Sequence, residues 1–419
     1  MAGERGLRTN IVTAQFYPRL AAAGVAASLV VLTFAFVVVK PWVPEAPLVN
    51  DFISFWTAAS LVREGAGSTL FDMGLQQGFQ RDLRLQVATL EEVRRQAGFL
   101  IPYHNPPALA LLFLPLTWLP LYWAYLLWSA LSLLATWVAV ALPLRSRPRA
   151  WTVVLVLLTF AGVADCLLWS QIAGVLLLAV SLGLLALTSG RPVLGGALLG
   201  LLWLKPQYAV VFALVFLVKG RRRELAGMVG AGLAVAILSL AMVGFGGILS
   251  YLELLNRIGE FNPPADSLVK PYAMINWRAL LLALWPGIPD SLGSALMLGL
   301  GAATVLASLL AWRGEWNPAS PRFPRQMLVA VLATLVASPH SHFHGTVLLL
   351  APLSMALARP MPGAVLSRAW GPMLALGYLL ALLIWPVRSV GWLFVPYSLL
   401  AVGLLLVQLR AGESRVVAL

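Results

Sequence analysis

The sequence predicts an all-α, polytopic membrane protein with about 12 transmembrane helices. Three observations predict this class: 60% of the 419 residues are hydrophobic, only 11% are charged, and the mean hydropathy is +0.87. Soluble globular domains carry roughly a quarter of their residues as charged side chains. We therefore expect a single membrane domain over residues 1–419, with no separate soluble domain.

The charge balance is strongly basic, with 29 Lys and Arg, 16 Asp and Glu, and a net charge of +13. The basic residues stand in short clusters between apolar runs, which is the arrangement that orients membrane helices. We therefore expect membrane lipid, and no nucleic acid, as a partner. The single cysteine, Cys166, excludes an internal disulfide and a metal cage built from cysteines.

The first apolar run, residues 20–39, is long and no small-residue cleavage motif follows it, so we expect a retained helix with a cytoplasmic N-terminus. Further runs long enough to cross a membrane follow it along the chain. They lie near residues 121–143, 151–168, 171–188, 225–248, 290–312, 327–339, 346–358, 370–386 and 391–409.

Residues 192–218 could form one crossing with a buried lysine or a hairpin of two half-length helices. Pro206 breaks the segment directly after that lysine. One crossing would put Arg191 and the basic run "KGRRR" at residues 219–223 on opposite sides, whereas a hairpin puts both inside. With the hairpin, most Lys and Arg residues lie inside with few acids, as the positive-inside rule requires. We expect this topology in the plasma (inner) membrane, with both termini cytoplasmic.

Two segments, residues 41–106 and 249–289, are long enough to form outward loops that carry chemistry. In the first loop, residues 51–63 predict an amphipathic helix in the lipid interface, with Asp51 and Ser54 on its polar face. Its apolar face would comprise Phe52, Phe55, Trp56, Ala59 and Val62. Asp51 could simply cap this helix. Residues 75–97 predict a charged surface helix, and the prolines of residues 101–120 predict a broken, partly dipping segment.

Lys205 is an ionisable group at membrane depth, where charge is costly and therefore often functional. Twelve helical residues before it rise roughly 18 Å, which leaves the lysine short of the far edge of a core roughly 30 Å thick. Its partner could be a phosphate anion in a cavity that opens outward, or a carboxylate such as Asp165. Both alternatives stay open.

Three of the four histidines occur in "SPHSHFHG", residues 338–345. His340, His342 and His344 share a face in an extended chain, whereas only His340 and His344 do so in a helix. Zinc or copper binding is conceivable, but nearby sequence offers no clear carboxylate ligand, so the pattern favours hydrogen-bonding or acid–base roles. We expect no metal site and no cofactor, and metal dependence stays open. The sequence has no Gly-rich nucleotide loop that would indicate coupling to ATP.

Several motifs resemble glycosyltransferase family 87 in their order over most of residues 50–355. They are "NDFISFWTAASLVREGAGSTLFD", "YHNPPALALLFLPLTWLPLYWAYLLWSALSLL", "SQIAGVLLLAVSLGLLAL", "LGGALLGLLWLKPQYAVVFALVFLVKGRRRELAG" and "SPHSHFHGTVLLLAPL". The resemblance implies a GT-C-type bundle with interfacial helices in the first outward loop. It also implies inverting transfer of a hexose, mannose by analogy, from a polyprenyl-phosphate donor. The acceptor would be a lipid-linked or cell-envelope glycan on the outer side of the plasma membrane.

The resemblance also implies roles for individual residues. Asp51 matches the family's catalytic base, which takes the proton from the acceptor hydroxyl as that oxygen attacks the anomeric carbon. His344 matches the family's histidine. The charge on the departing phosphate needs donors or cations, for which Lys205, Arg278 and His340 are candidates. Candidate contacts with donor or acceptor are Ser54, Tyr103, Asn105 and His342.

The main alternative is a secondary transporter or lipid flippase of the cell envelope, because many crossings and an embedded lysine would suit either. Transport predicts functional charges near the midplane at related positions of two repeats. The sequence shows no such repeat, and its acids gather in the outward loops. A non-catalytic partner in envelope assembly would be expected to carry a neutral residue in place of Asp51.

Overall fold

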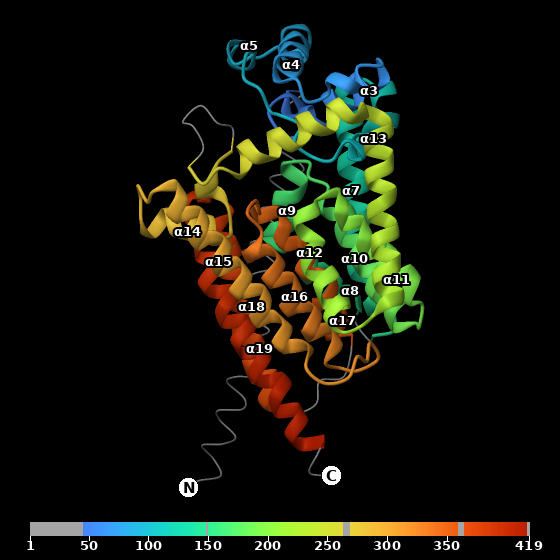
Figure 1. Cartoon of the computed structure of the whole chain (residues 1–419), viewed down its shortest axis with the longest axis vertical. Coiled ribbons are helices and arrows are strands. Elements are labelled where there is room, and N and C mark those ends of the chain that lie inside the picture. The colour runs from blue at the N-terminus through green and yellow to red at the C-terminus, as the bar shows by residue number, and fades with distance from the viewer. Residues whose placement is uncertain (1–44, 148–149, 263–268, 359–363, 417–419) are drawn as a thin grey trace.

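The computed structural model describes residues 45–147, 150–262, 269–358 and 364–416. These residues form helices and no strand, which confirms the all-α prediction for the described part of the chain. An isolated antiparallel bridge pairs Met274 with His342. The predicted first crossing, residues 20–39, lies outside the described residues. Figure 1 shows an elongated helix bundle with a group of shorter helices, α3 to α5, at one end.

Four helices in the described ranges are long and apolar enough to cross a membrane. They are α7 (Leu121–Leu144), α13 (Arg222–Gly259), α15 (Asp290–Leu309) with its continuation η9 (Leu310–Trp312), and η11 (Arg388–Leu393) with the first part of α19 (Phe394–Val416). The pair α8 (Ala150–Leu158) and α9 (Ala161–Leu168) would make a fifth span, bent by 56°. The count of twelve crossings therefore stays a prediction.

Shorter apolar helices fill the space between these long ones. They are α10 (Ala173–Thr188), α11 (Pro192–Gly200), α12 (Val210–Val218), α16 (Phe323–Ala337), η10 (Phe343–Leu349) with α17 (Leu350–Leu357), and α18 (Ala364–Ile384). Among these, α10 and α16 are mostly buried, since protein surrounds them. In contrast, most of α13 is exposed on the surface of the bundle, as lipid contact requires of an apolar helix.

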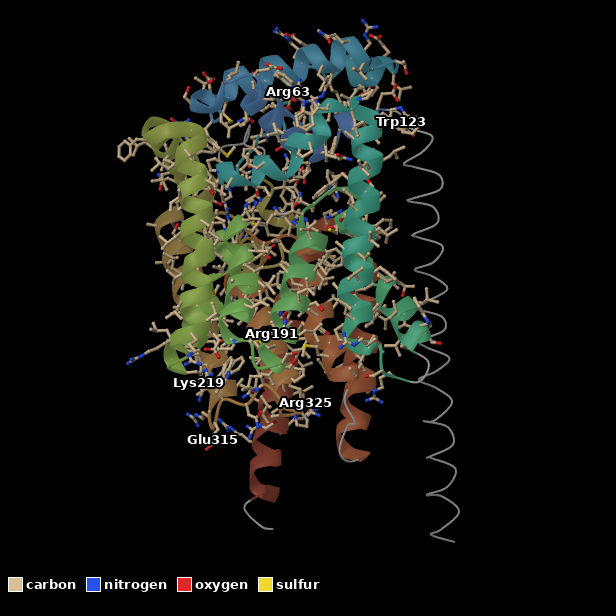
Figure 2. All side chains as sticks on the ribbon, turned by 90° about the vertical axis from the view of Figure 1, so that its right-hand side faces the viewer. Arg63, Trp123, Arg191, Lys219, Glu315 and Arg325 are labelled. Atoms are coloured by element: carbon tan, nitrogen blue, oxygen red, sulfur yellow. The ribbon has the colours of Figure 1, made fainter. Side chains whose placement is uncertain are left out.

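The segment from α11 to α12 forms a hairpin, as predicted. Lys205 interrupts it with non-helical backbone angles (φ −133°, ψ 84°), and Pro206 follows. Both ends of the hairpin reach the same end of the bundle, where Figure 2 places Arg191, Lys219 and Arg325 together. We call this the basic end, and the opposite end, which carries α3 to α5, the cap end.

Glycines allow α11 to approach the first turns of α13 closely. A Cβ at Gly196 would lie 1.9 Å from the carbonyl oxygen of Glu224, and one at Gly227 would lie 2.1 Å from that of Val193. Larger side chains at these positions would push the backbones apart. The contact fixes the start of α11 beside the start of α13, and α13 follows α12 directly. Both arms of the hairpin therefore contact α13, and their outer ends lie at the same end of the bundle.

The cap end differs from one expectation. Helix α3 (Phe52–Arg63) was expected to lie in the lipid interface, but residues Phe52 to Leu61 are all buried in protein. The reason is the segment that follows the cap helices: η4 (Pro107–Leu109), α6 (Ala110–Phe113) and η5 (Leu114–Trp118) fold beneath α3, and Phe113 stacks on Phe55 at 4.6 Å. This segment is broken, as its prolines predict. The apolar stripe of α3 is therefore covered by protein rather than lipid.

The predicted charged helix of residues 75–97 is divided into α4 (Met73–Val87) and α5 (Glu91–Arg95). Asp72 caps α4 by accepting a hydrogen bond from the Leu75 amide at 3.0 Å. Arg84 is buried, and its guanidinium donates to the carbonyl oxygens of Leu48, Ala97 and Phe99. One side chain therefore joins three separate parts of the cap end.

The second large loop begins later than expected, because α13 continues past residue 248 to Gly259. The helix bends at Gly244, whose positive φ of 67° suits a residue without a side chain. Beyond the bend it crosses the cap end toward α14 (Trp277–Leu284) in Figure 1. The buried guanidinium of Arg278, at the start of α14, binds the carbonyl oxygens of Ile258, Glu260 and Phe261 and so holds the end of α13.

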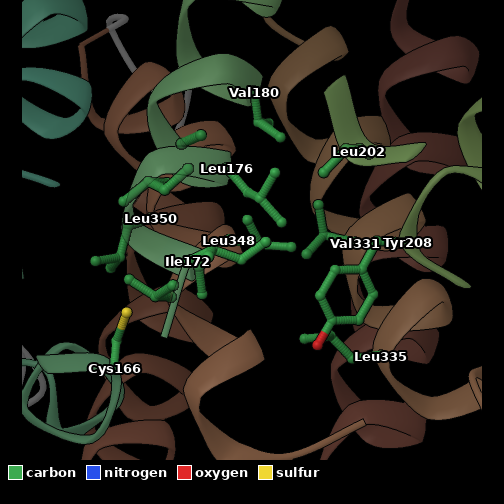
Figure 3. Packing of buried hydrophobic residues seen from close by; sticks show 14 of the residues in the cluster. Cys166, Ile172, Leu176, Val180, Leu202, Tyr208, Val331, Leu335, Leu348 and Leu350 are labelled. Atoms are coloured by element: carbon green, nitrogen blue, oxygen red, sulfur yellow. The ribbon is translucent and has the colours of Figure 1, made fainter. Parts of the chain in front are cut away.

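The hydrophobic core extends along the bundle from α3 to α19, and it includes the region where α9, α10, α16 and η10 meet the tip of the hairpin. Figure 3 shows Ile172, Leu176, Val331 and Leu348 packed around its centre. Cys166 and Tyr208 border this core close to Asp165 and Lys205 in the chain. The core therefore excludes water beside Asp165 and Lys205, and polar interactions are stronger in such surroundings.

Cysteine labelling can test the hairpin. With a membrane-impermeant maleimide and intact cells, we expect Arg81→Cys on α4 to react, and Arg191→Cys and Arg223→Cys to react only after permeabilisation. All three positions are exposed, and buried Cys166 serves as the unreactive background. Reaction of Arg191→Cys and Arg223→Cys from opposite sides would contradict the hairpin.

Candidate active site

Asp51 precedes α3, but its side chain does not cap that helix. Asn50 does so instead: its Oδ1 accepts a hydrogen bond from the Phe52 amide at 2.9 Å. Its Nδ2 donates to the carbonyl oxygen of Leu168 at 3.2 Å, which ties α3 to the end of α9. The alternative in which the side chain of Asp51 caps the helix is therefore not found. Because Asn50 takes that role, the Asp51 carboxylate is available for other partners.

Gln171 joins Asp51 to Lys205. Its Nε2 donates to Oδ2 of Asp51, and its Oε1 accepts a hydrogen bond from Nζ of Lys205 at 2.7 Å. A single amide side chain therefore separates the carboxylate from the ammonium group. Gln171 and Lys205 are both buried, with 5% and 8% of their surface exposed.

A strained turn between α9 and α10 holds Gln171 in place. Among the residues that the structure describes, Ser170 is the one non-glycine residue with a positive φ, 54°. Two hydrogen bonds fix the turn. Trp128 Nε1 donates to the carbonyl oxygen of Ser170 at 2.9 Å, and the backbone N–H of Gln171 donates to the carbonyl oxygen of Cys166 at 2.8 Å. Such backbone strain persists only where the surroundings impose it, and it is common at functional sites.

Lys205 continues this polar chain toward His344. Its Nζ lies 3.4 Å from Nε2 of His344, and Nδ1 of His344 lies 3.9 Å from Oδ2 of Asp165. The other oxygen of Asp165 pairs with the guanidinium of Arg388, which also lies over the ring of Trp169. The alternative in which Asp165 pairs directly with Lys205 is therefore not found. Two cations instead stand on either side of the His344 and Asp165 pair.

The histidines form a row. The ring centres of His104 and His340 are 5.3 Å apart, those of His340 and His342 4.8 Å, and those of His342 and His344 5.9 Å. The backbone before η10 is extended and pairs with residues 274–275 through the Met274 bridge and the Ile275 amide. Within the described ranges, no group of three or more His, Cys, Asp or Glu side chains has the geometry of a metal site.

Burial sets the protonation of two residues at the cap end. Burial raises the pKa of Asp51 to about 6, although the Gln171 hydrogen bond and the charge of Lys205 act in the opposite direction. Burial also lowers the pKa of His104 to about 4, and the charge of Lys205 contributes. At neutral pH Asp51 is therefore mostly ionised and His104 is neutral. A carboxylate with this pKa can accept a proton efficiently.

The other predicted site residues are engaged with backbone groups. Ser54 Oγ donates to the Pro102 carbonyl oxygen at 3.1 Å, and the Tyr103 hydroxyl donates to that of Pro106 at 2.7 Å. Asn105 is buried nearby in the chain. The guanidinium of Arg278 is taken up by the three carbonyl oxygens at the end of α13. The structure thus brings Asp51, Lys205 and the histidines of residues 340–344 together, without Arg278.

Sequence reasoning missed Gln171, Arg388 and His104. Gln171 lies within the quoted motif "SQIAGVLLLAVSLGLLAL", where a polar pair between two apolar runs was a usable signal. Arg388 follows an apolar run at a turn that was expected to face outward, so it departs from the positive-inside rule. A basic residue that breaks the orientation rule could have been examined as a functional candidate.

This arrangement combines two chemical capacities. Asp51 can accept a proton at the cap end, and Lys205 and Arg388 can balance an anion deeper in the bundle. Buried charges at membrane depth are costly, and these are retained with specific partners. The site therefore suits a reaction in which one group loses a proton while another leaves as an anion.

Comparison with known proteins identifies the family of the chain. The model of glycosyltransferase family 87 matches residues 103–339, which contain Asp165, Gln171, Lys205 and His104. No curated protein and no solved structure matches the chain. A glycosyltransferase in a membrane uses a sugar donor and an acceptor. Because the match covers more than half of the 419 residues, the chain belongs to glycosyltransferase family 87.

Proposed function

We propose that the protein is an inverting hexosyltransferase that uses a polyprenyl-phosphate sugar as donor. The observation that carries the proposal is the Gln171 amide, which holds the carboxylate of Asp51 and the ammonium of Lys205 one side chain apart. Glycosyl transfer from a lipid phosphate needs these two groups, a base for the acceptor and a cation for the leaving group.

The reaction is a single displacement. The acceptor hydroxyl gives its proton to Asp51 while its oxygen forms a bond to the anomeric carbon. The bond from that carbon to the phosphate oxygen breaks, and the phosphate leaves with the electron pair. Attack from the face opposite the leaving group inverts the configuration of the sugar carbon. Gln171 orients the base through its hydrogen bond to Oδ2 of Asp51.

The leaving phosphate lies beside Lys205, His344 and Arg388. Lys205 and Arg388 supply positive charge, and Nδ1 of His344 lies 3.9 Å from Oδ2 of Asp165. Arg388 also balances the buried carboxylate of Asp165, which would otherwise repel the phosphate. Arg388 takes the place in this proposal that the sequence assigned to Arg278. The other histidines of the row offer hydrogen bonds to sugar hydroxyls.

The cap end faces outward, from the plasma membrane toward the cell envelope. The support is the opposite end of the bundle, where Arg191, Lys219 and Arg325 gather (Figure 2), because basic clusters mark the cytoplasmic side. The acceptor is a lipid-linked or cell-envelope glycan, and mannose is the hexose that the family resemblance favours. A transporter or flippase has no need of a base that is oriented in this way.

The role of Asp51 can be tested with Asp51→Asn in vesicles supplied with polyprenyl-phosphate mannose. We expect transfer to fall by at least about 100-fold, because the amide cannot accept the proton, while donor binding stays within about twofold. Asp82→Asn is the matched control, since Asp82 lies in the same loop with an exposed side chain, and it should keep full activity. Full transfer by Asp51→Asn would reject the assignment.

The pH profile gives a second test. Protonation of Asp51 removes the base, so kcat/KM should fall about tenfold per pH unit below the pKa of about 6. Gln171→Leu removes a hydrogen bond that lowers this pKa, so its acid limb should move to higher pH. An acid limb near pH 4 in the wild type, the ordinary value for an exposed aspartate, would contradict the buried base.

The role of Lys205 is tested by donor affinity. Lys205→Ala should weaken donor binding by roughly 10- to 100-fold, because a charged hydrogen bond to the phosphate is lost, with a smaller effect on the acceptor. Lys219→Ala, at the basic end, is the control and should bind donor normally. Equal donor affinity of the wild type and Lys205→Ala would exclude the phosphate role.

A further inference from the structure

An apolar cavity that is partly open to the surroundings lies between α16, α17, α18 and α19. These helices contact one another in the lower part of the bundle in Figure 1. Leu332, Leu353, Ala381 and Leu405 are typical of the side chains that line it. The site described above does not include this space, and the reaction proposed above gives it no role.

The cavity is elongated. Its lining residues on α19 extend from Phe394 to Gln408, a separation of fourteen residues, which corresponds to roughly 21 Å at 1.5 Å per residue. This is about two thirds of the thickness of a bilayer's hydrocarbon core. A compact ligand would leave most of such a space empty, whereas a hydrocarbon chain would follow its length.

The cavity offers little to a polar ligand. The hydroxyl of Tyr378 donates to the Val156 carbonyl oxygen at 2.6 Å, and that of Tyr397 donates to the Met373 carbonyl oxygen at 3.3 Å. Gln408 is the last lining residue on α19, so its side-chain amide lies at the end of the cavity away from Arg388. Except beside Gln408, whose Oε1 accepts no hydrogen bond from the described residues, a polar occupant would lose its hydrogen bonds to water without replacement.

One end of the cavity adjoins the candidate active site. Phe160 directly precedes α9, which carries Asp165, and Phe343 directly precedes His344. Ile384, the last residue of α18, lies four residues before Arg388. The walls of the cavity are therefore continuous with the segments that position the cations.

We infer that this cavity binds the hydrocarbon chain of the lipid-phosphate donor. The inference rests on the proposed function and adds the location of the chain. The ligand that fits has an anionic head for Lys205 and Arg388 and one long apolar tail for the cavity. The acceptor does not fit this description, because its reacting hydroxyl must lie at Asp51. The donor does, because its phosphate lies beside Arg388 and its hydrocarbon chain begins at the phosphate.

The cavity acts through its shape. Bilayer lipid is as apolar as the cavity, so moving a chain from one to the other adds little hydrophobic free energy. A defined slot instead admits the chain in one shape, so a side chain that blocks the slot would clash with the bound donor without touching the reacting groups. We therefore expect the cavity to affect the KM for long-chain donors more than kcat.

Two neighbouring residues on α19 provide a matched pair of variants. Ala401 lines the cavity and is 5% exposed, whereas Leu400 faces away from the protein and is 51% exposed. Ala401→Phe places a ring in the cavity, and we expect it to raise the KM for a full-length polyprenyl donor roughly tenfold. The KM for a donor with a ten-carbon citronellyl chain should stay unchanged. Leu400→Phe should change neither value.

Photo-crosslinking tests the location directly. A polyprenyl phosphate with a diazirine in its chain should label peptides of α16, α18 and α19 in the full-length protein. Unlabelled polyprenyl phosphate should compete, and phosphatidylglycerol should not. Labelling confined to other helices would overturn the inference, and so would equal competition by phosphatidylglycerol, which would identify a resident membrane lipid.

The two variants also separate this inference from the proposed function. Equal KM values for Ala401→Phe and Leu400→Phe with the long donor would overturn the chain site while leaving the transferase intact. If Ala401→Phe lost activity with both donors, a lowered melting temperature would show that the variant is misfolded. The crosslinking pattern of the wild type would then test the chain site. A wild type that transfers sugar from neither donor would reject the proposed function, and crosslinking would still locate the chain.

Discussion

The arrangement of the site depends on the hydrogen bonds of one amide. Gln171 can join Asp51 to Lys205 only because its Nε2 donates and its Oε1 accepts, so a carboxylate or an ammonium in its place would leave one partner unsatisfied. These contacts join the start of α3, the turn after α9 and the tip of the α11 and α12 hairpin. Three segments distant in the chain are thereby held in one geometry, and the strain at Ser170 keeps the amide in place.

The remaining polar groups show how charge is accommodated at membrane depth. Asp165 has no exposed surface, and a buried carboxylate is destabilising without a cation. Arg388 supplies that cation, and His344 and Lys205 continue the polar chain to Gln171. Asp165, Lys205 and Asp51 therefore each have a partner from a distant segment of the chain. Such a set costs free energy that apolar residues would not, which is why we connect it with chemistry rather than with stability.

Part of this structure could be predicted from local patterns. Pro206 and the placement of basic residues predicted the hairpin, and the prolines of residues 101–120 predicted the broken segment. The surroundings of α3 could not be predicted, because in a membrane chain an apolar stripe looks the same whether lipid or protein covers it. Gln171 and Arg388 were missed because their partners lie 120 and 223 residues away along the chain. Local periodicity carries no information about such contacts.

The hairpin has a consequence for biogenesis. Its two arms, Pro192–Leu204 and Pro206–Val218, have thirteen residues each, and a helix of that length covers only about two thirds of the hydrocarbon core. Neither can be released into lipid as a stable stop-transfer segment, and Lys205 at the tip would resist partition without its polar neighbours. The hairpin must therefore enter as a unit against helices that are already inserted. The polar chain from Asp51 to Arg388 is consequently completed late, after η10 and η11 have been synthesised.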